Sequence, residues 1–500
     1  MRYSTLGVTL LLLLAACAPP SAAPPPVADP GVWFLEVAGD GVVWLGPETL
    51  STLDVDPRQE VPPQVHISHS DHELPTLPVH SQAGWGLLFF APDAASRYTD
   101  RTHIRVEIDQ PGQPVTTADP PPPTSIAEGA WVSTHREQDE RYLPQAETAQ
   151  PWFWEPLYAP AAVTHTWTLT EALPGPVTAT LHLWSHTGLP PQPDHQLRLH
   201  WDGRPVGEWT WDGTGMQHLT AAWDVAAPGQ HAFTIETPAL PEVDAAVVWI
   251  DGWDVTTLRP VTADGTLWQA AGDGLRLAEA PAGARLLDVT DPRAPVDLGP
   301  IPDDGVVGTE PGHRYWAGEP PAAREPLAVR PAERVDLEAL AGVDYLVLAP
   351  RPFHVPLEPL LDHRTQQGLT PALFSIQAVY DTLGSGQPDP APIQALVGVL
   401  PDLRYLLLVG DGAVEPGGYD GDAGALRVVT PLTRTRVLGE TPADGLLGGD
   451  RVAVGRLPAT SASEVSAIVD KVLRWEDQGT EPQVLLLSDD ENEFADMTGD

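Results

Sequence analysis

Short apolar runs that alternate with helical segments between residues 344 and 455 place the strongest constraint on the fold of this 500-residue chain. The elements we expect are strands at 344–350 (DYLVLAP), 369–375 (LTPALFS) and 404–411 (RYLLLVGD), with a helix at 357–368. Such alternation is typical of βαβ units whose parallel sheet is covered on both faces. We therefore predict an α/β domain with a doubly wound, mostly parallel sheet. Its chemistry is expected at the carboxyl ends of the strands, where Gly410 and Asp411 lie.

All-β regions precede this domain, because apolar and polar residues alternate there in short runs separated by turn residues. Asp202-Gly203, between Trp201 and Arg204, is a strong hairpin signal. The 57 prolines and 44 glycines agree with many turns. The division we expect is a signal peptide at 1–17, a Pro/Ala tether at 18–30, a β-rich domain at 31–118, a Trp-rich, jelly-roll-like β-sandwich at 148–260, a short β region at 261–330 and the α/β domain at 335–500.

The chain is strongly acidic, with a formal net charge of -42. Nucleic-acid binding depends on lysine and arginine side chains that neutralise phosphates, so this charge argues against a nucleic-acid partner. Hydrophobic residues make up 42% of the chain, which is enough for packed cores. We interpret the acidity as a means of staying soluble in an exterior rich in salt or calcium.

The N-terminus has the pattern of an export signal. Met1-Arg2 is a small positive region, and the apolar residues 6–14 are too few for a transmembrane span. The sequence LAAC that ends at Cys17 is similar to a bacterial lipobox, in which the cysteine is acylated; an ordinary signal peptide that contains a cysteine is the alternative. Cys17 is the only cysteine. We therefore expect no disulfides, and membrane contact only through a lipid anchor.

Two groups of side chains in the β regions allow a binding role as well as a structural one. Histidines at 66, 69, 72 and 80 lie close in sequence, but no second ligand pair of typical spacing accompanies them, so we expect a solvated polar loop and no metal site. Ten tryptophans crowd the sandwich: Trp152, Trp154, Trp167, Trp184, Trp201, Trp209, Trp211, Trp223, Trp249 and Trp253. An exposed row of them would favour sugar stacking, whereas burial between sheets would favour core packing, which their strand positions indicate.

Motifs along the last third of the chain are weak singly and specific in their order. They are DYLVL at 344–348, HR at 363–364 with Gly368, VYD at 379–381, GQPDP at 386–390, YLLLVGD at 405–411, GETPAD at 439–444, VGRLP at 454–458, VDKV at 469–472 and VLLLSDD at 484–490. In this order they resemble bacterial cysteine peptidases of the gingipain family. Together with FWEPL at 153–157 and DVTDP at 288–292, the resemblance covers roughly residues 148 to 500.

The resemblance implies a caspase-like sheet that presents a nucleophilic cysteine and a histidine that activates it. In the family order both follow the strand that begins at Val484, and the 500 residues end before either one. His354 and His363, in the first βα unit, are not substitutes. We therefore expect no peptidase activity from these 500 residues alone.

The resemblance also assigns peripheral roles. Asp490 matches the acid that orients the catalytic histidine in arginine-specific members, with an acidic strand-end loop as the alternative reading. Asp500 falls near the acid that lines the specificity pocket for basic side chains, and arginine pairs well with carboxylate. Calcium stabilises some relatives, and the oxygen-rich loop 411–422, with Glu415, is where a structural calcium ion could bind.

The leading hypothesis is an exported cysteine endopeptidase of gingipain type, at the cell surface or outer membrane as a lipoprotein or secreted, that acts on protein or peptide substrates. The alternative is a catalytically inactive surface lipoprotein that binds glycan or protein through its Trp-rich sandwich. A third possibility is a role in secretion or sorting, as in gingipain relatives that process exported proteins.

Overall fold

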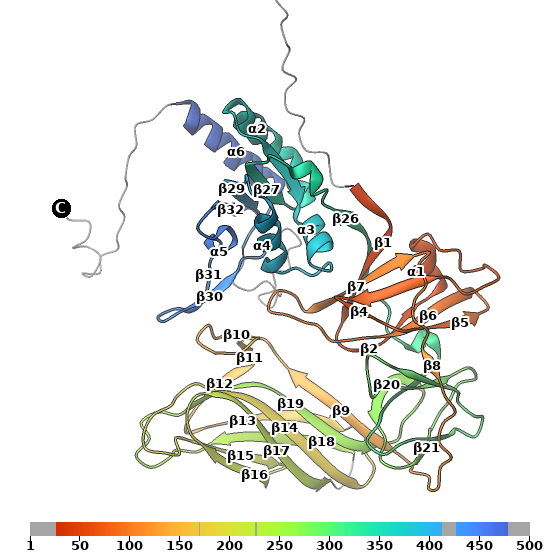
Figure 1. Ribbon diagram of the computed structural model, residues 1–500. Helices are drawn as coiled ribbons and strands as arrows, with labels where there is room; N and C mark the ends of the chain where they lie inside the picture. Colours follow the sequence, from red (N-terminus) through yellow and green to blue (C-terminus); the bar gives the residue numbers. More distant parts are fainter. Residues whose placement is uncertain (1–26, 170, 226–227, 413–426, 479–500) are drawn as a thin grey trace, which may run out of the picture.

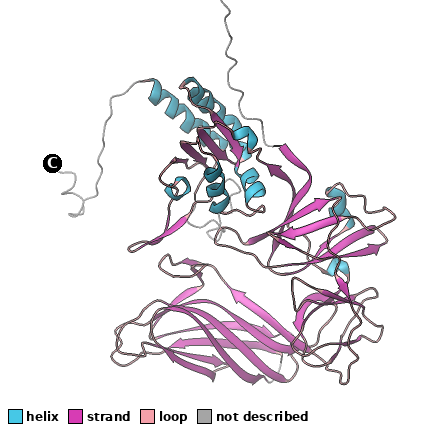
Figure 2. Cartoon of the chain, viewed as in Figure 1, coloured by secondary structure: helices cyan, strands magenta, loops and turns pink. Residues whose placement is uncertain are grey.

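The computed structural model describes residues 27–169, 171–225, 228–412 and 427–478. In Figure 1 the α/β domain lies at the top with the first β domain beside it, and the remaining β regions lie below both. Figure 2 shows that the longer helices gather in the α/β domain, while strands make up most of the rest. The predicted combination of N-terminal all-β domains with a following α/β domain is confirmed.

The first β domain packs two antiparallel sheets around an apolar core that includes Leu35, Leu87 and Ile104. The five-stranded sheet has the order β26-β1-β7-β3-β4 and the three-stranded sheet the order β2-β6-β5. The elements are β1 (Val27–Ala38), β2 (Gly41–Leu45), α1 (Pro47–Thr52), β3 (Val65–His69), β4 (His72–Glu73), β5 (Thr76–Ser81), β6 (Gly84–Ala91), β7 (Arg101–Ile108) and β26 (Ala328–Arg334). Because β26 pairs with β1, the end of the β-rich chain returns to the first domain before the α/β domain begins.

A ten-stranded sheet joins the sandwich to the β region that follows it. Its order is β17-β14-β19-β9-β20-β25-β22-β23-β8, and β12 also pairs with β19. The strands are β8 (Thr116–Thr117), β9 (Ala130–Glu137), β12 (Glu155–Tyr158), β14 (Gly175–Ser185), β17 (Gly215–Val225), β19 (Val247–Arg259), β20 (Asp264–Gln269), β22 (Arg285–Asp288), β23 (Val296–Pro300) and β25 (Arg314–Gly318). Residues 148–260 and 261–330 thus contribute strands to one sheet.

A four-stranded sheet, β13-β18-β15-β16, covers part of the long sheet and closes a core that contains Leu181, Leu199 and Trp253. Its strands are β13 (Ala161–Leu169), β15 (His195–Trp201), β16 (Arg204–Trp211) and β18 (Gly229–Thr237). Asp202 (φ 48°) and Gly203 (φ 75°) form the β15–β16 turn, as predicted. Two short antiparallel pairs complete this part: β10 (Arg141–Tyr142) with β11 (Trp152–Phe153), and β21 (Gly274–Arg276) with β24 (Val306–Gly308).

The α/β domain contains a four-stranded sheet of order β28-β27-β29-β32 in which every pairing is parallel. The elements are β27 (Tyr345–Ala349), α2 (His354–Gln366), β28 (Pro371–Ser375), α3 (Ile376–Leu383), α4 (Pro390–Val399), β29 (Tyr405–Val409), β30 (Leu432–Thr435), β31 (Gly439–Pro442), α5 (Gly445–Gly448), β32 (Ala453–Leu457) and α6 (Ala462–Asp477). Helices α2 and α6 bury Leu357 and Val465 with one face of the sheet, whereas α3 and α4 bury Val379 and Ile393 with the other. The sheet is doubly wound, as its apolar strands predict.

Candidate functional site

The carboxyl edge of the parallel sheet is built around Arg456, which ends up beside the predicted Gly410-Asp411 position. From β32 its guanidinium donates to the carbonyl oxygens of Gly410 (3.0 Å) and Val428 (2.8 Å). It also donates two hydrogen bonds of 2.7 Å to the carboxylate of Asp444. One arginine therefore ties both ends of the loop after β29 to the neighbouring strand. The paired geometry makes this a strong contact.

Space and charge around Arg456 agree with this anchoring role. A Cβ atom on Gly412 would lie 2.8 Å from the Cζ atom of Arg456, so a larger residue there would have to displace the guanidinium. Burial raises the pKa of Asp444, but the hydrogen bonds to its carboxylate, chiefly from Arg456, and the charge of Arg456 together lower it by more, so the pKa ends below its usual value. Asp411 uses its Oδ1 atom to accept the N–H of Gly412 (2.8 Å). The hydrogen bonds at this edge therefore hold the segments around Gly410, Val428 and Asp444 in fixed positions.

The hairpin β30–β31 leaves this edge and meets two β parts of the chain at Glu440. Arg97, from the first β domain, donates to the Oε2 atom of Glu440 (3.0 Å), and the hydroxyl of Tyr142 donates to the same atom (2.7 Å). The side chains of Arg97 and Glu440 are only 10% and 15% exposed. Burial and the Glu440 carboxylate raise the pKa of Tyr142 to about 12, so the phenol stays a donor. Three parts of the molecule converge on one carboxylate.

The same hairpin also forms hydrogen bonds with the backbone of residues 144–146. Arg434 donates to the carbonyl oxygen of Ala146 (2.7 Å), and the N–H of Glu440 donates to that of Pro144 (2.8 Å). A second contact joins α3 to β26, where Arg330 donates to both oxygens of Asp381 (2.7 and 2.8 Å). The side chain of Asp381 is 1% exposed. The α/β domain is therefore fixed to the β domains by buried ion pairs.

Histidines of the α/β domain have structural partners. The Nε2 atom of His354 lies 3.2 Å from the carbonyl oxygen of Ala349, and burial lowers the pKa of His354. The Nε2 atom of His363 lies 2.9 Å from Glu476 on α6. The part of the chain that the structure describes contains no cysteine. Within the described residues, neither imidazole therefore lies beside a thiol.

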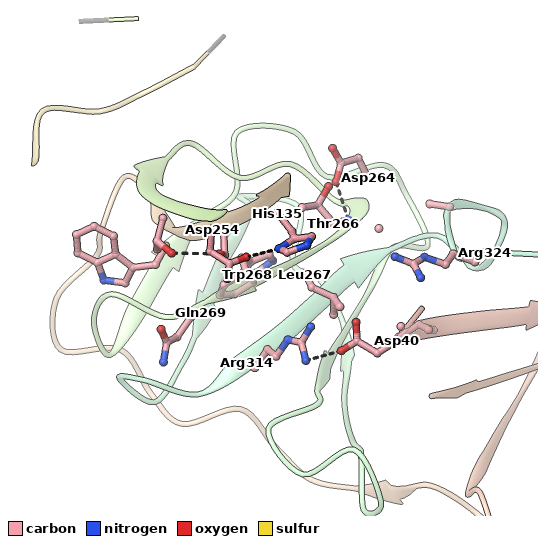
Figure 3. A pocket seen from close by; sticks show the side chains of 17 residues that line it. Asp40, His135, Asp254, Asp264, Thr266, Leu267, Trp268, Gln269, Arg314 and Arg324 are labelled. Carbon is pink, nitrogen blue, oxygen red and sulfur yellow. Dashed lines mark hydrogen bonds and ion pairs between the residues drawn. The ribbon is translucent and has the colours of Figure 1, made fainter. Parts of the chain in front are cut away.

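A cavity of about 920 Å³ lies where the first β domain meets strands β9, β19, β20 and β25 of the long sheet (Figure 3). Asp40 and Arg314 pair across it (2.8 Å), and His135, Asp254 and Asp264 contribute further polar groups. Trp131 adds an apolar wall. Sequence reasoning missed this cavity because its lining comes from separate stretches spread between residues 40 and 324, which only the fold brings together.

The histidines at 66, 69, 72 and 80 lie on strands, and the prediction of a polar loop is wrong. His66 and His69 belong to β3, His72 to β4 and His80 to β5. His66 pairs with Glu107 (3.0 Å), and the ring of His80 packs edge-on against Trp85. His66 alternates with the buried residues Val65 and Ile67, a pattern that favours a strand. Across the described ranges, no group of three or more His, Cys, Asp or Glu side chains is arranged to hold a metal ion.

The ten tryptophans of the sandwich are buried or half-buried. Trp152, Trp167, Trp184, Trp201 and Trp253 are at most 7% exposed, and Trp154, Trp209, Trp211 and Trp223 pack against the same core as Trp253. The tenth, Trp249, packs against a smaller cluster with Phe153. This distribution supports the packing interpretation over a row for sugar stacking.

Several residues predicted to be functional lie outside the described residues. These are Cys17, Asp490, Asp500 and, in the acidic loop, residues 413–422 with Glu415, Asp420 and Asp422. Within the described part, no helix is both long and apolar enough to span a bilayer.

Comparison with known proteins agrees with the motif order. Residues 338–500 match the model of peptidase family C25, so the predicted resemblance to the gingipain family is confirmed for this part of the chain. The chain is similar to the crystal structure of dimeric latent PorU from Porphyromonas gingivalis, at 14% identity and a TM-score of 0.61, covering 89% of this chain and 49% of that chain. The chain thus spans about half the length of the PorU chain, and at this identity the likeness concerns the fold.

Other solved structures match smaller parts of the chain. The CBM36-1 domain of a multidomain xylanase from the hindgut metagenome of Trinervitermes trinervoides matches at 14% identity, covering 25% of this chain and 95% of that chain. Its TM-score of 0.18 is too low to support an argument. A search of the curated proteins gave no match.

Proposed function

We propose that this chain supplies the accessory β domains and the first part of the catalytic domain of an exported, gingipain-like cysteine endopeptidase. The reaction is attack of a thiolate on a peptide carbonyl, followed by hydrolysis of the thioester. In this proposal, the thiolate and its activating imidazole lie C-terminal to the strand expected at 484–490. In this proposal Asp490 orients the imidazole and Asp500 lines a pocket for an arginine or lysine side chain of the substrate.

The observation that supports this proposal best is the parallel sheet β28-β27-β29-β32 within the residues that match peptidase family C25. Membership in a peptidase family implies a protein or peptide substrate. A nucleophile and base act efficiently only when they are held in a fixed geometry. The Arg456–Asp444 pair at the carboxyl edge supplies such rigidity next to the position where the following strands would add to the sheet.

The β domains have a restraining role in this proposal. PorU was crystallised in a latent form. In the present chain the hairpin β30–β31 leaves the carboxyl edge and is held by Arg97 and Tyr142 through Glu440. Contacts of this kind would keep the edge in one conformation until the β domains move or are cleaved.

The proposed location is outside the cytoplasm, with a lipid on Cys17 as the anchor. The alternative of an inactive glycan-binding lipoprotein gains no support from the buried tryptophans. Binding of a structural calcium ion by the loop 411–422 remains a proposal that rests on the sequence alone.

Activity of the native protein tests this function. Protein purified from its source cells should hydrolyse peptides with arginine or lysine before the scissile bond, and iodoacetamide should abolish the activity. The recombinant 500-residue chain is the matched control and should be inactive, because its one cysteine is Cys17. Native protein that is inactive after removal of its β domains, or a 500-residue chain whose hydrolysis is lost on alkylation, would contradict the proposal.

A further inference from the structure

A row of imidazole and carboxylate groups crosses the outer face of the long sheet. It runs over four neighbouring strands, from His218 on β17 to His182 on β14, Asp254 on β19 and His135 on β9. His182 and His218 are direct cross-strand partners. The residues that follow or precede them, Leu181 and Leu219 among these, point into the sandwich core. Because side chains alternate between the two faces of a strand, the histidines lie on the solvent side.

Hydrogen bonds along the row fix the state of His182. Its Nε2 atom lies 2.8 Å from Oδ2 of Asp254, and the Nδ1 atom of His135 lies 3.0 Å from Oδ1 of the same carboxylate. A carboxylate only accepts hydrogen bonds, so the Nε2 atom of His182 carries a proton. In the neutral ring the Nδ1 atom of His182 then holds a lone pair, which faces the neighbouring strand.

The facing group is a second imidazole nitrogen. The Nδ1 atoms of His182 and His218 are 2.8 Å apart, and the two rings meet edge to face. Two nitrogens bound at about 2.0 Å to one metal ion lie about 2.8 Å apart when the angle at the metal is about 90°. A tetrahedral angle would need a separation of about 3.3 Å at the same bond length. The spacing suits neighbouring positions of a tetragonal ion.

We propose that His182 and His218 form a two-nitrogen site for a divalent late transition-metal ion, with Cu²⁺ bound most tightly and water completing the coordination. Imidazole nitrogens suit copper, nickel and zinc, and Cu²⁺ heads the affinity order of the divalent ions. The metal replaces the single proton that the two Nδ1 atoms share. The site has only two protein ligands. It therefore differs from a group of three or more His, Cys, Asp or Glu side chains arranged around one metal ion, of which the described residues contain none.

Asp254 is a positioning residue for this site. Metal-binding histidines commonly donate their second ring N–H to a carboxylate, which fixes the ring and makes it a better ligand. Asp254 does this for His182, and His135 holds the other oxygen of Asp254, with Glu137 at its far side (2.8 Å). Figure 3 shows His135 and Asp254 at the wall of the 920 Å³ cavity, so the row reaches from the sheet edge to that cavity.

Copper titration of the complete 500-residue chain, prepared without a histidine tag, tests the proposal. With one equivalent of CuCl₂, electron paramagnetic resonance should show a tetragonal spectrum with coupling to two nitrogens. Calorimetry should give tighter binding for Cu²⁺ than for Zn²⁺. His182→Ala and His218→Ala should each weaken Cu²⁺ binding at least tenfold and remove the two-nitrogen coupling. Asp254→Asn should weaken binding about tenfold while keeping both nitrogens, because it changes only the ring's support.

A matched control separates this site from other surface imidazoles. His186 is exposed just beyond the end of β14, and His186→Ala should bind Cu²⁺ as the unchanged chain does. His218 is itself exposed, so His218→Ala should keep the circular dichroism spectrum and melting temperature of the unchanged chain. If His182→Ala does not fold, Cu²⁺ binding by His218→Ala decides between the outcomes. Retention of the two-nitrogen spectrum and of the affinity in His218→Ala would overturn the proposal.

Discussion

Arg456 sits at the point where the strands of the parallel sheet end and the connecting loop begins. Its guanidinium donates four hydrogen bonds, to two carbonyl oxygens and to both oxygens of Asp444, so one side chain holds three segments of this edge together. Sequence reasoning placed Asp411 at the functional edge because aspartate follows the apolar strand. The motif VGRLP contained the relevant residue, and the arginine among apolar neighbours was the available signal.

Replacement of Arg456 should therefore destabilise the α/β domain. Arg456→Met leaves the half-buried Asp444 without its partner, and we expect a loss of about 2–4 kcal/mol in the free energy of unfolding. Arg404→Met is the control, because the Arg404 guanidinium is 60% exposed and 3.8 Å from Asp344, and it should change stability by less than about 0.5 kcal/mol. Urea unfolding followed by circular dichroism measures both. Equal losses in the two variants would refute the anchoring role.

At the scale of elements, the pairing of α2 with α6 depends on Glu476. Arg364 donates to both oxygens of its carboxylate (2.6 and 2.8 Å), and His363 contacts it at 2.9 Å. The hydrogen bonds from Arg364 lower the pKa of Glu476 from 4.5 to about 2. Helix α6 is amphipathic, and its first turn is capped by Ser461, so local sequence and packing agree on its position.

This pKa shift predicts an acid-dependent contribution to stability. Because the folded state holds the carboxylate ionised, the stabilisation is complete above pH 4.5 and is lost as the pH falls towards 2. Glu476→Gln should therefore be less stable than the unchanged chain at pH 7, by on the order of 1 kcal/mol for this partly exposed group. The difference between the two melting temperatures should shrink below pH 4.5. A difference that stays constant down to pH 2 would exclude this linkage.

The hairpin β30–β31 is the second element whose position depends on one carboxylate. Glu440→Ala removes the acceptor for Arg97 and Tyr142 and leaves both donors in a buried interface. We expect faster amide hydrogen exchange at residues 432–442 and at 142–146, since their shared hydrogen bonds open more often. Arg436→Ala, at the exposed tip of the hairpin, is the control and should exchange as the unchanged chain does. Unchanged exchange in Glu440→Ala would show that other contacts hold the hairpin.

At the scale of the whole molecule, the sequence predicted best the strands that are buried on both faces of the parallel sheet. The strands at 345–349, 371–375 and 405–409 lie within the predicted runs, because strands buried on both faces need continuous apolar sequence. Strand β9 falls in residues 119–147, outside every predicted domain, and its solvent-facing side carries Ser133, His135 and Glu137. The return of β26 to β1, the polar cavity and the cross-strand His182–His218 pair all depend on long-range pairing, which local patterns do not encode.

The chain combines a C25-type sheet with β domains that are fixed to it by buried ion pairs. In the proposed function, the β domains hold a peptidase scaffold whose reactive thiol lies C-terminal to the strand expected at 484–490. Covalent labelling of the thiol tests this proposal. Native protein from its source cells is treated with a chloromethyl ketone of an arginine-ending peptide, and the labelled residue is mapped by mass spectrometry. We predict one labelled cysteine, in chain beyond the strand expected at 484–490, and no label on Cys17. Native protein in which no cysteine is labelled, even after its β domains are removed, would contradict the account.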